Sequence, residues 1–476
     1  MSYFLGRATE LKQLENLMQR KKACIAVVKG RRRIGKSRLI KEFAKDKVFL
    51  PFAGIAPTNT VSAQEQRNSF AGQLSALFNV PTVIYDDWVA VLAALTVQLT
   101  HKPTVLLFDE ISWMGSQDKT FIPKLKNWWD LVLQDYPNIL LVFCGSISTW
   151  IEENIINSTA FFGRIALYID LQELSLAESY AMLRKQGITL STHDVFKLLS
   201  ITGGVPWYLE QIEAGQTADE NIARLCFRRS GLLVHEFDRI FSDLFEGKGI
   251  IYQKIINALC GSMKNLAQLR GDLHYPEGQA LGKYLNHLII SGYVTKHYSW
   301  SMQTGHIGKQ NLYRLSDNYL RFFLKYIEPN LPKIEKNSFA DVTLTALPGF
   351  KSLMGLQVEN LLLNNRAPLL NALDIKPQDV VADNPYLQKA ASRRKGCQID
   401  YMIQTQSRNL FICEFKFNTQ ELKMNVIDDM KEKIKRLSVP KGFGICPVLV
   451  HFGDVSDAVH DTRYFFKIID MSSLLI

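Results

Sequence analysis

The segment CIAVVKGRRRIGKSRLIKEFAK, residues 24–45, combines an apolar run, a glycine-rich loop and a helix-like pattern. The run from Cys24 to Val28 has the composition of a strand buried on both faces. The loop from Gly30 to Ser37 has the spacing Gly-x-x-x-x-Gly-Lys-Ser, and apolar residues at helical spacing follow it. Strand, loop and helix in this order predict a phosphate-binding loop, and a chance glycine-rich turn is the alternative that these flanks disfavour.

The chemistry of this loop predicts binding of ATP or GTP with Mg²⁺. Glycines let the backbone curl so that successive N–H groups point at phosphate oxygens. Lys36 is placed to neutralise the β and γ phosphates, and the hydroxyl of Ser37 is a ligand for Mg²⁺. The predicted nucleotide-binding residues of the loop are Gly30, Arg31, Arg32, Arg33, Ile34, Gly35, Lys36, Ser37 and Arg38.

Two later apolar runs end in polar residues suited to the same site. HKPTVLLFDEISWMG places Asp109 and Glu110 at the end of a buried strand, where open α/β sheets bind ligands. Asp109 is expected to reach the Mg²⁺ through its water shell, and Glu110 to orient or deprotonate the attacking water. NILLVFCGSIS ends at Ser146, which is either a sensor of the γ-phosphate or only a helix cap. The acidic pair favours hydrolysis over binding alone.

Length and charge limit the class of protein. A chain of 476 residues predicts two or three domains, and a net charge of +10 fits a nucleic-acid or nucleotide partner without requiring one. The sequence has no long uncharged apolar run and no signal-peptide pattern at its start, so we expect a cytoplasmic protein without a membrane partner. Seven scattered cysteines without zinc-site spacing indicate small core residues.

These motifs, with FLGRATELKQLENL, FFGRIALYIDLQELSLAES and ITGGVPWYLEQI, resemble the prokaryotic, especially archaeal, ATPases of the AAA+/STAND type over residues 1 to about 235. The resemblance implies ATP as the nucleotide, Gly6 and Arg7 near the adenine, and Ser146 as the first sensor. It also implies that Arg164 is an arginine finger or sensor, in cis or in trans within a homo-oligomer. The turn that ends at Pro206 would pack on the nucleotide from a helical lid. A structural ion pair is the alternative for Arg164.

The segment 249–315 has the pattern of three short amphipathic helices followed by a hairpin, the order of a winged helix. In that fold the third helix, with Lys283, Tyr284 and His287, would enter a DNA groove. A lid extension that packs between domains and touches no DNA is the alternative.

The last part of the chain carries a second set of charged residues. GFKSLMGLQVENLLLNN predicts a helix with Glu359 in an apolar face, and GCQIDYMIQTQSRNLFICEFKF predicts two strands that carry Asp400, Glu414 and Lys416. Alternation along a strand puts Glu414 and Lys416 on one face. Asp400 and Glu414 are hard oxygen ligands for Mg²⁺, and Lys416 suits a metal-activated water and a scissile phosphate.

This set resembles the core of PD-(D/E)XK nucleases, in which Glu359, Asp400, Glu414 and Lys416 would be catalytic. Glu359 would bind the metal or its water. The basic run Arg393, Arg394 and Lys395 suits a DNA backbone, with a solvated loop as the alternative. A surface hairpin with one ion pair is the alternative for the whole pattern.

We therefore expect an α/β protein with a P-loop ATPase core at 1–170, a helical lid at 171–245, a winged-helix-like domain at 246–330 and a restriction-endonuclease-like domain at 340–476. The predicted function is ATP binding and hydrolysis coupled to action on DNA by a metal-dependent nuclease-like domain. The alternative is a nucleotide-switched signalling or scaffold ATPase whose last domain binds DNA or protein without cleaving.

Overall fold

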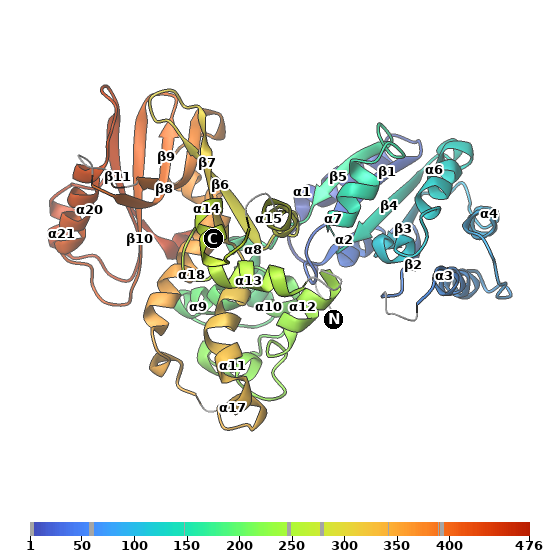
Figure 1. Cartoon of the computed structure of the whole chain (residues 1–476), viewed down its shortest axis with the longest axis horizontal. Coiled ribbons are helices and arrows are strands. Elements are labelled where there is room, and N and C mark those ends of the chain that lie inside the picture. The colour runs from blue at the N-terminus through green and yellow to red at the C-terminus, as the bar shows by residue number, and fades with distance from the viewer. Residues whose placement is uncertain are drawn as a thin grey trace. The chain divides into compact units, whose positions relative to one another are not determined.

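The computed structural model describes residues 4–56, 61–146, 148–244, 249–276, 280–340, 342–388, 390 and 395–476. The chain divides into two compact units. The first takes in the residues up to Glu173 together with Ile290–Gly292, and the second takes in Leu174–Ile289 and Tyr293–Ile476. Each unit has its own five-stranded sheet (Figure 1).

The sheet of the first unit is parallel throughout, with the strand order β2-β3-β4-β1-β5. The strand that precedes the glycine-rich loop, β1, therefore lies inside the sheet between β4 and β5. The strands are β1 (Cys24–Lys29), β2 (Val48–Ala53), β3 (Thr104–Asp109), β4 (Ile139–Gly145) and β5 (Ile165–Asp170). This confirms the predicted α/β class with a parallel sheet.

Alternation along the strands divides the core of the first unit into two layers. Ile25 and Val27 of β1 belong to one apolar cluster, and Ala26 and Val28 belong to the other. Side chains of α1 and α2 complete the second cluster, and those of α3 to α6 complete the first, so that both faces of the sheet are covered. The helices are α1 (Ala8–Met18), α2 (Lys36–Phe43), α3 (Ala63–Phe78), α4 (Trp88–Val97), α5 (Ile111–Gly115), α6 (Phe121–Leu131) and α7 (Ser148–Ile151).

The second unit begins with helices and continues through a hairpin to a mixed sheet. Its first helices are α8 (Leu176–Lys185), α9 (Thr192–Thr202), α10 (Pro206–Leu209), α11 (Ala218–Cys226), α12 (Glu236–Leu244), α13 (Gly249–Leu259), α14 (Leu266–Asp272) and α15 (Leu281–Ile290). The antiparallel hairpin of β6 (Val294–Trp300) and β7 (Ile307–Leu315) follows. Three helices and a hairpin therefore occur in the predicted order.

The mixed sheet of the second unit has the strand order β12-β11-β10-β9-β8. Strands β8, β9 and β10 are antiparallel, whereas β10, β11 and β12 are parallel. The strands are β8 (Val380–Gln388), β9 (Cys397–Thr405), β10 (Asn409–Phe417), β11 (Gly444–Phe452) and β12 (Lys467–Asp470). The remaining helices are α16 (Asn318–Phe322), α17 (Leu331–Glu335), α18 (Phe350–Asn364), α19 (Arg366–Ala372), α20 (Asn425–Arg436) and α21 (Asp457–Asp461). The predicted helix around Glu359 and the two predicted strands are confirmed as α18, β9 and β10.

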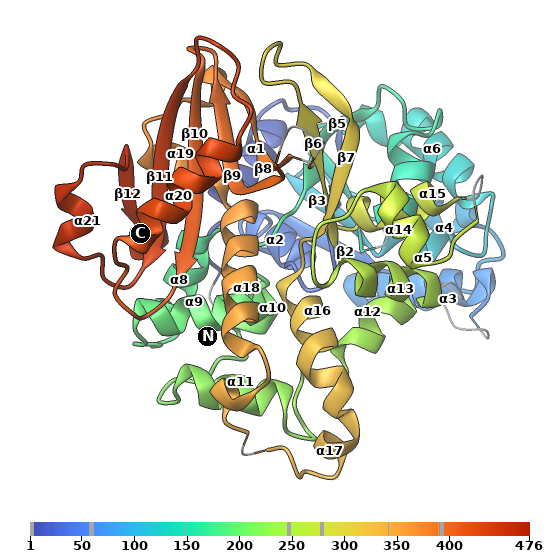
Figure 2. The same cartoon turned by 60° about the vertical axis from the view of Figure 1, so that its left-hand side comes forward.

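The hairpin β6–β7 packs on the mixed sheet, beside β8 (Figure 2). Trp300 and Met302 belong to the same apolar cluster as Ile399 and Met402 of β9. The indole Nε1 of Trp300 donates to Oε1 of Gln404 at 2.7 Å, within the buried interior. The segment predicted as a wing thus contributes to the core under the C-terminal sheet.

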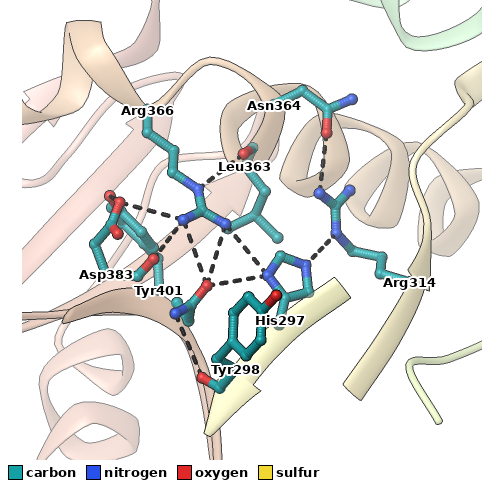
Figure 3. A network of polar contacts seen from close by, with 9 residues as sticks. His297, Tyr298, Arg314, Leu363, Asn364, Arg366, Asp383 and Tyr401 are labelled. Carbon is teal, nitrogen blue, oxygen red and sulfur yellow. Dashed lines mark hydrogen bonds and ion pairs between the residues drawn. The ribbon is translucent and has the colours of Figure 1, made fainter. Parts of the chain in front are cut away.

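A polar network joins the same hairpin to α18, α19 and the sheet (Figure 3). Nε of Arg314 donates to Nε2 of His297 at 3.0 Å, and Nη2 of Arg314 donates to Asn364 at 2.9 Å. Arg366 forms an ion pair with Asp383 at 3.2 Å, and its Nη2 lies 3.2 Å from Nδ1 of His297. The predicted middle segment and the C-terminal segment are therefore held together by polar as well as apolar contacts.

Within the described part of the chain, no helix has the length and apolar character needed to cross a membrane. Five of the cysteines, Cys24, Cys144, Cys226, Cys397 and Cys413, are buried, as expected of core residues, and all seven are free thiols.

Candidate functional site

The loop after β1 has the backbone shape of an anion cradle. Gly30 has a φ of 153° and Gly35 a φ of 92°, which only glycine adopts without strain. A Cβ on Gly30 would lie 2.5 Å from the carbonyl oxygen of Leu171. Both glycines are therefore required by the path of the chain. Helix α2 begins directly after Gly35, so its free N–H groups and its positive dipole end face the loop.

The ammonium of Lys36 lies inside this loop. Its Nζ donates to the carbonyl oxygens of Gly30 at 3.0 Å and Arg31 at 3.1 Å, and only 6% of the residue is exposed. Phosphate oxygens are stronger acceptors for an ammonium than carbonyl oxygens are. The lysine is thus held at the place where the β and γ phosphates are predicted.

The predicted Mg²⁺ ligands lie side by side. Oγ of Ser37, at the start of α2, donates to Oδ2 of Asp109, at the end of β3, over 2.5 Å. A hydroxyl and a carboxylate at this distance form a pair of hard oxygen ligands of the kind that Mg²⁺ takes beside phosphates. The donor set therefore fits the metal that was predicted from the sequence.

Glu110 is held in a strained conformation next to this pair. Its φ of 49° lies in the left-handed region, which is uncommon for a residue with a side chain. Its Oε2 accepts hydrogen bonds from both N and Oγ of Ser146, each at 2.9 Å. Burial raises the pKa of Glu110, whereas Lys36 lowers it. A carboxylate with a raised pKa beside a predicted phosphate site has the properties of a general base.

Of the two residues predicted near the adenine, Gly6 and Arg7, the side chain of Arg7 contacts the backbone of the loop. Arg7 follows Gly6, and both have positive φ values. Nη2 of Arg7 donates to the carbonyl oxygens of Gln172 at 2.6 Å and Ile34 at 3.4 Å. Arg7 therefore fixes the N-terminal segment against the loop, whereas the position of the adenine stays a prediction.

The other arginines of the loop differ in exposure. Arg31 is buried and pairs with Glu173 at 2.9 Å, whereas Arg32, Arg33 and Arg38 are half-buried. The pair of Arg31 and Glu173 links the loop to the last residue of the first unit. Direct nucleotide contacts by these side chains stay predictions.

Arg164, which directly precedes β5, forms an ion pair with Asp130. Its Nε and Nη2 donate to the two oxygens of Asp130 at 2.6 and 2.8 Å. The hydrogen bond from Arg164 lowers the pKa of Asp130 to about 2. The structural ion pair named above as the alternative is therefore present, and the catalytic role of Arg164 stays a prediction. Pro206 begins α10 in the second unit, and its contact with nucleotide also stays a prediction.

The second charged set is brought together in the C-terminal sheet. Asp400 lies on β9, and Glu414 and Lys416 lie on the neighbouring β10. Oδ2 of Asp400 accepts from the N–H of Phe415 at 2.9 Å, and Nζ of Lys416 lies 2.9 Å from Oε1 of Glu414. The strands therefore assemble the three residues that the sequence pattern predicted.

Lys433 of α20 is a member of this cluster that the sequence pattern did not reveal. Its Nζ forms an ion pair with Oε2 of Glu414 and lies 3.9 Å from Oδ1 of Asp400. Its segment, MKEKIKRL, contains several lysines at helical spacing, and nothing in the sequence distinguishes the one that points to the sheet.

The carboxyl of Glu359, on α18, feels the charge of Asp400. Burial raises the pKa of Glu359 well above the usual glutamate range, and the carboxylate of Asp400 raises it further. Burial likewise raises the pKa of Asp400, and Glu414 adds to that rise. Carboxylates that raise one another's pKa in a buried setting favour binding of a cation.

In the described residues, the C-terminal cluster offers two carboxylates to a divalent metal, with an ammonium between them. There, no group of three or more His, Cys, Asp and Glu side chains is arranged to hold a metal ion. The oxygens of Asp400 and Glu414 are suitable in type, but the ammonium of Lys433 lies between them. Of the basic run upstream, Arg393 and Arg394 lie outside the described residues, and Lys395 is exposed.

The predicted DNA-reading helix, α15, has one exposed and two packed side chains among the three that were expected to contact DNA. Lys283 is exposed, but Nδ1 of His287 lies 2.7 Å from the hydroxyl of Tyr252, and Tyr284 packs edge-on against the same ring. Two of the three side chains therefore pack on α13. DNA binding by this helix stays a prediction.

The first unit also contains a buried cation that no sequence pattern indicates. Nζ of Lys29, at the end of β1, pairs with Glu152 at 2.6 Å and Asp170 at 3.6 Å. These acids lie far from Lys29 along the chain, so no local pattern signals the cluster.

The parallel sheet, the loop and the paired acids define a P-loop ATPase domain in the first unit. Residues 4–212 match the family model described as an ATPase domain predominantly from Archaea. A relative, an uncharacterized protein of Methanocaldococcus jannaschii, is 22% identical over 340 residues, which cover 71% of each chain.

Two solved structures are also similar to this chain. The Walker-type ATPase of Pyrococcus abyssi gives a TM-score of 0.49 at 16% identity, over 67% of this chain and 96% of that one. The ORC2 protein of Aeropyrum pernix gives a TM-score of 0.41 at 14% identity, over 70% of this chain and 97% of that one.

Proposed function

We propose that the first unit hydrolyses ATP and thereby controls a metal-dependent, nuclease-like site in the second unit that acts on DNA. The observation that carries the second half of this proposal is the cluster of Asp400, Glu414, Lys416 and Lys433. Two carboxylates on the neighbouring strands β9 and β10 lie beside two lysines, and the charge of Asp400 raises the pKa of Glu359 on α18. An arrangement of this kind is costly in a protein without a function for it.

In the nucleotide site, the residues divide the work between binding and turnover. Lys36 is placed to exchange its two carbonyl acceptors for phosphate oxygens. Ser37 and Asp109 would hold Mg²⁺, which would supply charge neutralisation at the phosphates. Glu110 accepts a proton from the attacking water. Because Ser146 donates two hydrogen bonds to Glu110, release of these bonds is the step that frees the base.

In the C-terminal site, Asp400 and Glu414 would hold a divalent ion, which supplies Lewis-acid chemistry at a phosphate when bound. Lys416 stabilises the negative charge that develops at the scissile phosphate. Glu359 holds a proton or a water near the two acids, since its raised pKa lets it exchange a proton near neutral pH.

A continuous set of contacts supports control by nucleotide. Arg31 of the loop pairs with Glu173, and the next residue, Leu174, donates its N–H to the carbonyl of Gly204 at 2.8 Å. Gly204 follows the end of α9, and the start of α9 packs on Phe417 of β10. A change at the phosphate loop therefore has a physical route to the strand that carries Glu414 and Lys416.

The test is incubation of the purified chain with supercoiled plasmid, Mg²⁺ or Mn²⁺, and ATP or ADP. We expect nicking that depends on metal and on the nucleotide present. Asp400→Asn is the matched variant, because it keeps the shape and removes one charge. DNA affinity should fall steeply with salt, because each neutralised phosphate releases counterions. Binding that is independent of salt, with no nicking under any nucleotide, would refute action on DNA.

A second candidate function is a nucleotide-switched signalling or scaffold ATPase, possible as a homo-oligomer. The observation that favours it is the hairpin β6–β7, which packs into the C-terminal core through Trp300 and Gln404. Together with the inward packing of Tyr284 and His287, this leaves less of the winged-helix segment for DNA. Nucleotide-dependent binding of a protein, without cleavage of DNA, would support this candidate.

A further inference from the structure

Lys433 contacts both carboxylates that are proposed to hold metal. It lies on α20, three residues before the end of that helix, and reaches across to β9 and β10. Its Nζ pairs with Oε2 of Glu414 and lies 3.9 Å from Oδ1 of Asp400. A cation placed between two carboxylates on neighbouring strands has the position that a bound divalent ion would take.

The remaining oxygens of the two acids are also occupied. Oε1 of Glu414 contacts Lys416 at 2.9 Å, and Oδ2 of Asp400 accepts from the N–H of Phe415 at 2.9 Å. Lys416 contacts only one of the two acids, and the N–H of Phe415 is fixed in the backbone of β10. Lys433 is therefore the group that contacts both acids through a long side chain with several rotatable bonds.

The side chain of Lys433 has space to move into. A pocket of about 500 Å³ lies over Asp400, and its wall includes Lys433, Arg436, Gln388 and Cys397. The side chain of Glu414 is 7% exposed, whereas that of Lys433 is 29% exposed. A long, flexible side chain at this border exchanges a buried ion pair for a position in the pocket by rotation of its own bonds.

In the absence of metal, the charges favour the position of Lys433 between the carboxylates of Asp400 and Glu414. The ammonium of Lys433 lies against the carboxylates of both Asp400 and Glu414, which stabilise its charged form. Removing the lysine leaves two neighbouring carboxylates without their bridging cation, which is unfavourable unless another cation replaces it.

We propose that Lys433 is a tethered cation that occupies the divalent-metal position and that a metal must displace to bind. This inference rests on the proposed metal site in the second unit. It assigns Lys433 a regulatory part in that site: the lysine sets the metal affinity of Asp400 and Glu414. Arg436, which pairs with Glu432 at 2.9 Å, lines the same pocket.

The test is calorimetric titration of the full-length chain with Mn²⁺, comparing wild type with Lys433→Met. Methionine keeps the length and apolar character of the stem but removes the competing charge. We expect Lys433→Met to bind Mn²⁺ about tenfold more tightly, because the metal no longer displaces a charge-assisted hydrogen bond. Lys433→Arg, which keeps the charge, should bind no more tightly than wild type.

Lys416→Met is the matched control, since it removes a lysine that touches only Glu414. We expect a smaller gain in affinity than for Lys433→Met. ATP turnover by the first unit and the far-ultraviolet circular dichroism spectrum report whether each variant is folded. Both should match wild type, because Lys433 lies in the other unit.

The outcomes separate this inference from the proposed function. Wild type that binds Mn²⁺ while Lys433→Met binds it equally or more weakly overturns the tethered-cation role and leaves the metal site standing. Absence of Mn²⁺ binding in both wild type and folded Lys433→Met overturns the metal site and the inference together. Tighter binding by Lys433→Met and by Lys433→Arg alike would show that the positive charge at this position does not limit metal binding, and would also overturn the inference.

Discussion

The imidazole of His193 at the start of α9 stacks on the ring of Phe417 at the end of β10, with centroids 5.2 Å apart and parallel planes. Phe417 follows Lys416 directly, so this contact joins the helix to the strand of the C-terminal site. The ring of Phe452 on β11 also lies 5.2 Å from the same imidazole. The helical segment predicted as a lid is therefore packed on the C-terminal sheet.

Replacing His193 with alanine should weaken this connection. Loss of two ring contacts is worth about 1 to 2 kcal/mol, so the thermal unfolding midpoint of the second unit should fall by a few degrees. If α9 transmits nucleotide state to β10, the difference in plasmid nicking between ATP and ADP should also shrink.

The matched control is His101→Ala, which removes an exposed histidine that stacks on Tyr136 in the first unit. It should leave both the unfolding of the second unit and the nucleotide dependence unchanged. An unaltered ATP-to-ADP difference in His193→Ala would argue against α9 as the route.

Replacing Lys36 with alanine should abolish ATP binding or lower it at least tenfold, because this ammonium is buried in the loop where the phosphates are predicted. Binding of a fluorescent ATP analogue and phosphate release measure the two effects. Lys41→Ala, on the exposed face of the same helix, is the control and should behave as wild type. Nearly normal hydrolysis by Lys36→Ala would refute the assignment of the phosphate loop.

Replacing Glu110 with glutamine should preserve ATP affinity and slow hydrolysis about a hundredfold. The amide oxygen still accepts the two hydrogen bonds from Ser146, but the side chain no longer takes up a proton. Single-turnover hydrolysis at saturating ATP measures the chemical step. Turnover within a factor of about two of wild type would show that another group activates the water.

The contribution of His297 to the stability of the second unit should fall as the pH is lowered from 7 to 5, whereas Glu359 and Asp400, whose pKa values are raised, contribute in the opposite direction. Burial, together with the charges of the neighbouring Arg314 and Arg366, lowers the pKa of His297 to about 3. A histidine with a lowered pKa in the folded state takes up its proton first in the unfolded chain. Its contribution is therefore complete above about pH 6.5 and is lost as the pH falls toward 3, by about 2 kcal/mol at pH 5.

Urea unfolding of the second unit at pH 7 and pH 5 measures this dependence. His297→Gln has no titrating ring and should lack the part of the stability loss on acidification that His297 causes, so its stability at pH 5 relative to pH 7 should be higher than that of wild type by about 2 kcal/mol. His306→Gln, in the exposed turn of the same hairpin, should retain the wild-type difference. An equal pH dependence in wild type and His297→Gln would exclude His297 as its source.

The parts of the fold that local sequence patterns encode were predictable, and the long-range pairs were not. Gly30, Lys36 and Asp109 belong to short motifs whose geometry follows from their spacing, so the phosphate loop and the end of β3 were found from the sequence. The bridge made by Lys433 and the cluster around Lys29 join residues that lie far apart along the chain. Their side chains carry no signal until the elements pack.

The hairpin β6–β7 also shows that local patterns do not predict long-range packing. Its order after three helices predicts a winged helix, and the order was correct. Trp300 and Gln404, which seat it on the C-terminal sheet, belong to segments that were assigned to separate domains. Periodicity along a strand shows that one face is buried but not which partner buries it.

The last prediction distinguishes the roles of Asp400 on β9 and Lys416 on the neighbouring strand β10. Asp400→Asn removes a full negative charge from the proposed coordination sphere while keeping the hydrogen bond from Phe415, so affinity for Mn²⁺ and plasmid nicking should fall together. ATP turnover should persist, since the nucleotide site lies in the other unit. Lys416→Met should differ: metal binding should persist while nicking is lost, because the charge that stabilises the reacting phosphate is gone. Calorimetry and plasmid nicking on the same preparations measure both quantities. Equal losses of metal affinity in the two variants would show that Lys416 helps to form the metal site and does not act on the reacting phosphate.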